Sequence, residues 1–171
     1  MIRNGSCFLL RREALDRAGW FDAGLPACVD TDLCLRVAGL RPGNVVAIPE
    51  VRTFRRRRRG QVSSDWRRQE AGYLQLMERL RKSGLPELRR EENRSRAGRY
   101  RYYARLALEA GEAGPSARLL AIAFCWAPGW LLADPGTWLL GLSVVCHLLL
   151  PRGWSLRVVR SGRRLLGTRR S

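Results

Sequence analysis

This sequence of 171 residues has almost no lysine, a single histidine and few acidic residues. Lys82 is its one lysine, so nearly all of its 32 basic residues are arginines, against 15 aspartates and glutamates. The formal net charge of +17 favours partners that carry negative charge, such as nucleic acid, anionic lipid headgroups or nucleotide phosphates. A GC-rich genome would also explain arginine in place of lysine.

The sequence also lacks any Cys-x-x-Cys pair, and its cysteines are odd in number. They are Cys7, Cys28, Cys34, Cys125 and Cys146. This pattern disfavours a zinc site or a disulfide framework and favours reduced thiols. The first ten residues contain no long apolar run before a cleavage site, so we expect no signal peptide. We therefore expect a cytoplasmic protein, with peripheral attachment to the inner face of the cell membrane as an alternative.

An unbroken apolar run of membrane-spanning length is missing as well. Pro128 and the pair Asp134-Pro135 divide the apolar residues 119–150 into two pieces, and each is shorter than the roughly 20 residues that a span requires. This pattern is consistent with two buried helices, and it is equally consistent with a hairpin that lies in one face of a bilayer. His147 within this run is more typical of a packed residue than of a ligand. The tail that follows carries seven arginines, which suit an anionic leaflet: Arg152, Arg157, Arg160, Arg163, Arg164, Arg169 and Arg170.

Hydropathy and charge divide the chain into three regions: residues 1–63, an amphipathic helical region at 64–118, and an apolar helical hairpin with a basic tail at 119–171. In the first region, residues 5–10 and 44–48 are apolar runs of strand length, and a third strand is expected to begin at 51. The predicted class is therefore α+β, predominantly α, with 2–4 short strands and two short helices before a helical C-terminal region.

Two longer helices are predicted in the second region. Ser63-Ser64-Asp65 offers an N-cap for a helix that ends at Ser83-Gly84, and residues 85–95 are predicted to be turn-like. A second amphipathic helix closes at Gly111. Its tyrosines, interleaved with arginines, could stack on bases, but their helical spacing is more typical of a core stripe.

The segment from Asp30 to Gly39 is predicted to be a short helix that presents a carboxylate at its start. Asp30 is suited to the N-cap, and Arg36 stands one turn from Asp32, where the two can form an ion pair. Gly39 is predicted to end the helix in a left-handed conformation.

Several short motifs follow one another in residues 5–63. After an apolar strand they read, in order, Arg11-Arg12-Glu13-Ala14-Leu15, Gly19-x-Phe21-Asp22, Asp30-x-Asp32-Leu33-x-Leu35-Arg36, a strand closed by Pro49, and an arginine run ending Gly60-Gln61-Val62-Ser63. This order resembles the acceptor-side half of family-2 glycosyltransferases of the GT-A fold. Two positions depart from that family: Val29 replaces an acid, and Arg58 replaces the usual histidine.

The resemblance implies a role for each matched residue. In inverting members a carboxylate at the start of this helix deprotonates the acceptor hydroxyl, and Asp30 matches it. Asp32 is placed with Asp30 among the catalytic residues, because it matches a neighbour that fixes the start of the helix. The remaining matches are Arg36, Arg56, Arg57, Arg58 and Arg59 for substrate or diphosphate binding, and Gly19, Phe21 and Asp22 as a structural motif. Guanidinium groups suit the leaving diphosphate.

The family's nucleotide-binding half, with its metal-binding D-x-D, would precede the matched segment. Asp30-Thr31-Asp32 opens a helix, whereas the metal aspartates follow a strand, so we prefer the base assignment. We expect a C-terminal fragment of an inverting glycosyltransferase that is inactive alone. Magnesium or manganese is expected for the intact family, with ligands absent from this chain. A nucleotide-sugar and a glycan or lipid-linked acceptor are the partners expected once a donor half is supplied.

A second hypothesis comes from a different class: a basic helical protein that binds nucleic acid or anionic membrane surfaces. The run Arg55 to Arg59 would then be a solvated or nucleic-acid-attracting tract, and Asp30 and Asp32 an ordinary helix start with an Arg36 ion pair. No helix-turn-helix, zinc-finger or RNA-recognition signature is visible. A third hypothesis is a helical scaffold in which residues 64–166 bind a partner protein.

Overall fold

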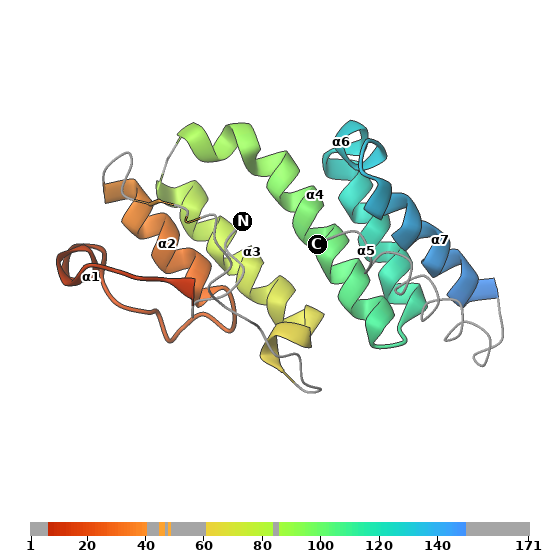
Figure 1. Cartoon of the computed structure of the whole chain (residues 1–171), viewed down its shortest axis with the longest axis horizontal. Coiled ribbons are helices and arrows are strands. Elements are labelled where there is room, and N and C mark those ends of the chain that lie inside the picture. Colours follow the sequence, from red (N-terminus) through yellow and green to blue (C-terminus); the bar gives the residue numbers. More distant parts are fainter. Residues whose placement is uncertain (1–6, 41–44, 47, 49–60, 84–85, 150–171) are drawn as a thin grey trace. The chain divides into compact units, whose positions relative to one another are not determined.

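The computed structural model describes residues 7–40, 45, 46, 48, 61–83 and 86–149, which are helical and contain no β-strand (Figure 1). The elements are α1 (Arg12–Ala18), α2 (Val29–Leu40), the 3-10 helix η2 (Val62–Ser64), α3 (Trp66–Ser83), α4 (Pro86–Glu109), α5 (Ala113–Trp126), α6 (Pro128–Leu132) and α7 (Pro135–Leu149). They belong to two compact units, Met1–Leu85 and Pro86–Ser171. The split separates α3 from α4, which both lie in the predicted region 64–118.

The predicted α+β class, with the partial GT-A subdomain of 2–4 strands that the resemblance implies, is wrong for the described residues. Phe8, Leu9 and Leu10 are irregular, and so are Val45 and Val46 of the second expected strand. Leu9 and Val46 are also exposed, at 98% and 82%. A strand exists only where a neighbouring strand satisfies its backbone N–H and C=O groups, and a short apolar run does not supply that neighbour. The third expected strand, in residues 51–58, lies outside the described residues.

Unit 1 buries apolar residues from helices α2 and α3 and from the loop 19–28, which links α1 to α2. They are Leu25, Ala27 and Cys28 of the loop, Leu33, Cys34 and Val37 of α2, and Tyr73, Leu76 and Met77 of α3. The predicted cap of α3 is confirmed, because Asp65 Oδ1 accepts hydrogen bonds from the backbone N–H groups of Arg67 and Arg68, both at 3.1 Å.

Helix α3 approaches the loop 19–28 at a distance that requires glycine. A Cβ atom on Gly72 would lie 2.6 Å from the carbonyl oxygen of Ala27 and 2.8 Å from its backbone carbon and nitrogen. Arg68 adds a polar contact nearby, since its Nε donates to the carbonyl of Pro26 at 2.7 Å. Backbone-to-backbone contact therefore fixes α3 against the residues that precede α2.

Unit 2 is built on the helical hairpin of α4 and α5 (Figure 1). Gly111 ends α4 in the left-handed region, with φ 83°, while the N–H of Gly111 donates to Leu108 O and that of Glu112 to Ala107 O, both at 2.9 Å. These bonds form a Schellman motif and confirm the predicted helix end at Gly111. The side chains buried along the two helices are Arg96, Ala97, Tyr100, Tyr103, Ala104, Leu106 and Ala107 of α4, and Ser116, Leu119, Leu120 and Ala123 of α5.

Helix α4 starts earlier than the sequence predicted. Residues 85–95 were expected to be turn-like because they are charged, but α4 already begins at Pro86. Proline is well accepted in the first turn of a helix, where its missing N–H has no partner to lose. Glu92 and Arg96 then form an i, i+4 ion pair at 2.8 Å, which supports the helix.

Candidate functional site

The candidate site is the start of helix α2, where Asp30 and Asp32 lie two residues apart. Asp32 is 5% exposed and forms the predicted ion pair with Arg36. Its Oδ2 accepts from Arg36 Nε at 2.9 Å and lies 2.8 Å from Nη2 of the same guanidinium. Asp32 depends on Arg36, because a buried charge without a partner is costly.

Arg36 also binds the backbone at the end of α1. Its guanidinium donates to the carbonyls of Ala18, of Gly19 at 3.0 Å and of Trp20 at 2.9 Å. Carbonyls at a helix C-terminus lack intrahelical donors, so Arg36 satisfies groups that would otherwise need water. A guanidinium has five N–H donors. These backbone and Asp32 contacts engage Nε and both terminal nitrogens, so Arg36 joins α1 to α2.

Asp30 differs from Asp32 in its surroundings. Its side chain is half-buried, and its Oδ1 accepts from the backbone N–H of Thr31 at 2.8 Å. Among the described residues, no cationic side chain forms an ion pair with Asp30, and no hydrogen bond engages its Oδ2. One carboxylate oxygen at the start of α2 is thus left without a bonded partner within that part of the chain.

The boundaries of α2 differ from the prediction at both ends. The helix begins at Val29, so Asp30 lies inside the first turn and is not the N-cap. Cys28 precedes the helix with φ 64°, and its carbonyl accepts from the N–H of Asp32 at 2.9 Å. Helix α2 continues through Gly39 to Leu40, so the predicted left-handed end at Gly39 is also wrong.

The two buried cysteines around this helix start are free thiols. Burial, and second the nearby charge of Asp30, raise the pKa of Cys34 above its ordinary value. A thiol with a raised pKa stays protonated near neutral pH, and the protonated thiol is not a nucleophile. Cys34 is therefore unsuited to act as a nucleophile.

Gly19 and Asp22 shape the loop that leads to α2. Gly19 ends α1 with φ 79°, and its N–H donates to Leu15 O at 2.8 Å. Asp22 Oδ1 accepts from the N–H of Gly24 at 2.7 Å, and Asp22 Oδ2 pairs with Arg79 of α3. The bonds to Arg79 and Gly24 hold the pKa of Asp22 below its usual value. Phe21, the third residue of the predicted motif, is 53% exposed.

Sequence reasoning missed two arginines that support this loop, Arg68 and Arg79 on α3. Each contacts a residue more than forty positions earlier, Pro26 or Asp22. The one signal in the sequence for these contacts is that Arg68 and Arg79 lie on the same face of α3. The predicted diphosphate-binding residues Arg56, Arg57, Arg58 and Arg59 lie outside the described residues.

The carboxylates of α2 do not fit a metal site. Asp32 Oδ2 is occupied by Arg36, which leaves Asp30 as the one carboxylate of Asp30-Thr31-Asp32 without a cationic partner in the described chain. No group of three or more histidine, cysteine, aspartate or glutamate side chains in the described residues is arranged to hold a metal ion.

Two tyrosines and one arginine of α4 belong to the core of unit 2. Tyr100 and Tyr103 are buried, which confirms the core interpretation over base stacking. Arg96 is 7% exposed, pairs with Glu92, and lies over the ring of Trp126 at 4.4 Å. The charge of Arg96 is therefore engaged inside unit 2, between Glu92 and the ring of Trp126.

No family model, curated protein sequence or solved structure matches this chain. Its function is therefore inferred from its motifs and from the geometry of α2.

Proposed function

We propose that this chain provides the acceptor side of an inverting glycosyltransferase related to family 2, which transfers a sugar from a nucleotide-sugar to an acceptor hydroxyl. The observation that carries the proposal is the different state of two neighbouring carboxylates. Asp32 is buried and paired with Arg36, whereas Asp30 is half-buried and keeps Oδ2 without a bonded partner in the described residues. The ordered motifs of residues 5–63 support the same assignment.

Asp30 acts as the general base in this proposal. Its carboxylate takes the proton of the acceptor hydroxyl as the hydroxyl oxygen attacks the anomeric carbon. The bond between that carbon and the diphosphate oxygen breaks, and the electron pair leaves with the nucleoside diphosphate. A single base suffices, whereas a glycosidase needs two carboxyl groups that flank the bond.

Asp32 and Arg36 are positioning residues in this proposal. Arg36 fixes the end of α1 against α2 through the carbonyls of Gly19 and Trp20, and Asp32 orients the guanidinium. Together they hold the first turn of α2, and with it Asp30, at a fixed place beside the loop 19–28. A base must lie within hydrogen-bond reach of the proton it removes, so such anchoring bears directly on rate.

The donor site is assigned to additional polypeptide. A nucleotide-sugar site of this family needs a strand-rich half with its own metal aspartates, and magnesium or manganese would act there. The arginines of residues 56–59 are proposed to neutralise the departing diphosphate. We expect the chain alone to show little or no transfer, and we place it in the cytoplasm, where nucleotide-sugars are made and where its free cysteines stay reduced.

Reconstitution of activity tests the proposal. The chain is assayed alone and together with a separately produced nucleotide-binding half of a family-2 glycosyltransferase, with release of nucleoside diphosphate as the readout. We expect transfer only in the mixture, and a loss of about 100-fold or more in Asp30→Asn. The matched control is Asp16→Asn, an exposed carboxylate on α1.

Two results would contradict the proposal. Full activity of Asp30→Asn in the mixture would remove its role as base. Tight, metal-dependent binding of a nucleotide-sugar by the chain alone would show that the donor site does not need a second half.

A further inference from the structure

Helix α7 has its small residues inside and its large apolar residues outside. Thr137 and Val144 are its buried side chains, and Gly141 lies between them at contact distance from Leu120 of α5. The large exposed apolar residues are Trp138, Leu139, Leu142, Val145, Leu148 and Leu149, with Leu142 at 63% and Leu149 at 77%. An ordinary surface helix shows the opposite distribution. We call these six residues the α7 apolar face.

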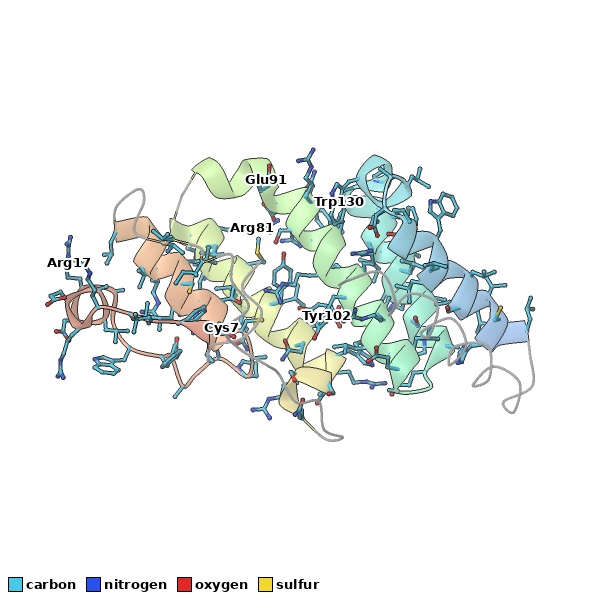
Figure 2. All side chains as sticks on the ribbon, viewed as in Figure 1. Cys7, Arg17, Arg81, Glu91, Tyr102 and Trp130 are labelled. Atoms are coloured by element: carbon cyan, nitrogen blue, oxygen red, sulfur yellow. The ribbon has the colours of Figure 1, made fainter. Side chains whose placement is uncertain are left out.

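The α7 apolar face is continuous and held in place. Residues 138–149 extend about 17 Å along the helix axis. In Figure 2 side chains of α7 (blue) project away from α4, α5 and α6. The start of α7 is fixed because Asp134 binds Arg101 of α4 and accepts from Thr137 Oγ1 at 3.0 Å. Trp138 is fixed as well, since its Nε1 donates to Leu132 O at 2.9 Å.

Helix α6 also carries two exposed large apolar residues, Trp130 and Leu132, and Figure 2 shows Trp130 beside α4. The guanidinium of Arg101 lies 5.9 Å from the centre of the Trp130 ring. Trp138 thus stands at the start of the α7 apolar face, and indole rings favour the boundary between water and lipid headgroups.

Charge distinguishes the possible occupants of this face. The sequence that follows α7, residues 150–171, carries seven arginines and no acidic residue. A second copy would bring together two chains of net charge +17, which repel each other. A bilayer with anionic headgroups offers both an apolar layer for α7 and negative charge for the arginines. Apolar insertion and basic residues are the two signals that stable attachment to a membrane surface requires.

We propose that α6 and α7 attach the protein to the surface of an anionic membrane, with the α7 apolar face inserted at the level of the headgroups. Attachment is to one leaflet. No described helix combines the length and the apolar character needed to cross a bilayer. This proposal is independent of the glycosyltransferase assignment, because its test involves no sugar.

Vesicle sedimentation with the full chain tests the proposal. We expect binding to vesicles of phosphatidylcholine with phosphatidylglycerol, and weak binding to phosphatidylcholine alone. The variant carries Leu142→Gln, Val145→Gln and Leu149→Gln, which remove three exposed side chains and keep good helix formers. We expect its affinity for the anionic vesicles to fall by at least about tenfold.

The matched control removes three exposed apolar side chains of unit 1 through Leu9→Gln, Val46→Gln and Leu74→Gln, and we expect its affinity to change by less than about twofold. Circular dichroism of both variants reports whether the helices persist. Quenching of tryptophan fluorescence by brominated lipid gives a second measurement, which should weaken in Trp138→Phe.

Three results would overturn the proposal. The first is no binding of the unmodified chain to anionic vesicles. The second is equal binding by the α7 variant. The third is a dimer in sedimentation velocity that becomes a monomer in the α7 variant, because a second copy would then cover the face.

Discussion

Different kinds of interaction stabilise the interior of each of the two units of this protein. In unit 1, arginine side chains join segments that are distant in sequence: Arg36 binds carbonyls after α1, Arg68 binds Pro26, and Arg79 binds Asp22. In unit 2, helices pack through alanine, leucine and tyrosine, and one buried hydroxyl, that of Ser116, links α5 to α4. Unit 1 therefore adds several polar contacts between distant segments to its apolar core, whereas the hairpin of α4 and α5 in unit 2 relies mainly on apolar packing.

The difference shows what the arginines of this sequence do. A net charge of +17 suggests a protein whose basic residues face a polyanion, yet several arginines of unit 1 bond to backbone or carboxylate groups of the protein itself. A planar guanidinium offers five N–H donors in a fixed fork, whereas a lysine ammonium offers three on a compact group. The loop that leads to Asp30 is positioned by this means. Substitutions in each unit test whether polar contacts and apolar packing contribute to stability in this way.

The largest effect is expected for Arg36→Ala in unit 1. This change leaves the buried Asp32 without its partner and the carbonyls of Gly19 and Trp20 without donors. We expect a loss of about 2–4 kcal/mol in the opening free energy of α2, measured by amide hydrogen exchange. Arg17→Ala, an exposed arginine on α1, serves as control and should change it by less than about 0.5 kcal/mol. Unchanged protection of α2 in Arg36→Ala would contradict the role of Arg36.

Gly72→Ala should be the next most damaging change. Its Cβ would meet the backbone of Ala27 at 2.6 Å, so α3 or the loop must shift, at a cost of about 1–3 kcal/mol. Gly39→Ala is the matched control: it lies in α2 with open space around the new Cβ and should stabilise by about 0.5–1 kcal/mol. Urea denaturation measures both, and equal effects would show that α3 does not pack tightly on the loop.

A smaller effect is expected in unit 2 for Ser116→Ala. The hydroxyl of Ser116 is fully buried and donates to Ala104 O at 2.7 Å, so its loss should cost about 1 kcal/mol in the free energy of unfolding. Ser143→Ala removes a hydroxyl that donates to Leu139 O at the same distance on the exposed side of α7, and it should cost less than about 0.5 kcal/mol. Equal losses of unfolding free energy would mean that the hydrogen bond between Ser116 and Ala104 does not contribute to stability beyond apolar packing.

The smallest effect concerns pH and Asp22. Arg79 and the N–H of Gly24 lower the pKa of Asp22 in the folded state, so its ion pair stabilises unit 1 fully above the ordinary aspartate pKa of 3.8. That stability is lost as the pH falls through the lowered pKa of the folded state. Asp22→Asn should therefore lose less stability than the unmodified protein when the pH is reduced from 7 to about 3. Thermal melts at the two pH values measure the difference, and identical pH dependence would contradict the assignment.

Local sequence signals predicted much of the helical structure. The cap at Asp65, the left-handed end at Gly111 and the ion pair of Asp32 with Arg36 each involve residues within five positions of one another. Such contacts are governed by helix geometry, which the sequence reports directly.

Contacts between distant segments could not be predicted in the same way. The bonds of Arg36 to Gly19 and Trp20 span 17 and 16 residues, and the approach of Gly72 to Ala27 requires the folded path of the loop. The apolar runs at residues 5–10 and 44–48 indicated burial, but a strand also needs a partner, which a single run does not identify. The separate surroundings of Asp30 and Asp32 likewise appeared only with the fold.

The most direct test of this account compares the unfolding free energies of Asp30→Asn and Asp32→Asn. Because Asp32 is the buried partner of Arg36 and Asp30 has no cationic partner among the described residues, we expect Asp32→Asn to cost about 2 kcal/mol or more. Asp30→Asn should change stability by less than about 0.5 kcal/mol. Equal losses of unfolding free energy, or a greater loss for Asp30→Asn, would contradict the proposal that Asp32 positions the helix start while Asp30 is available as the base.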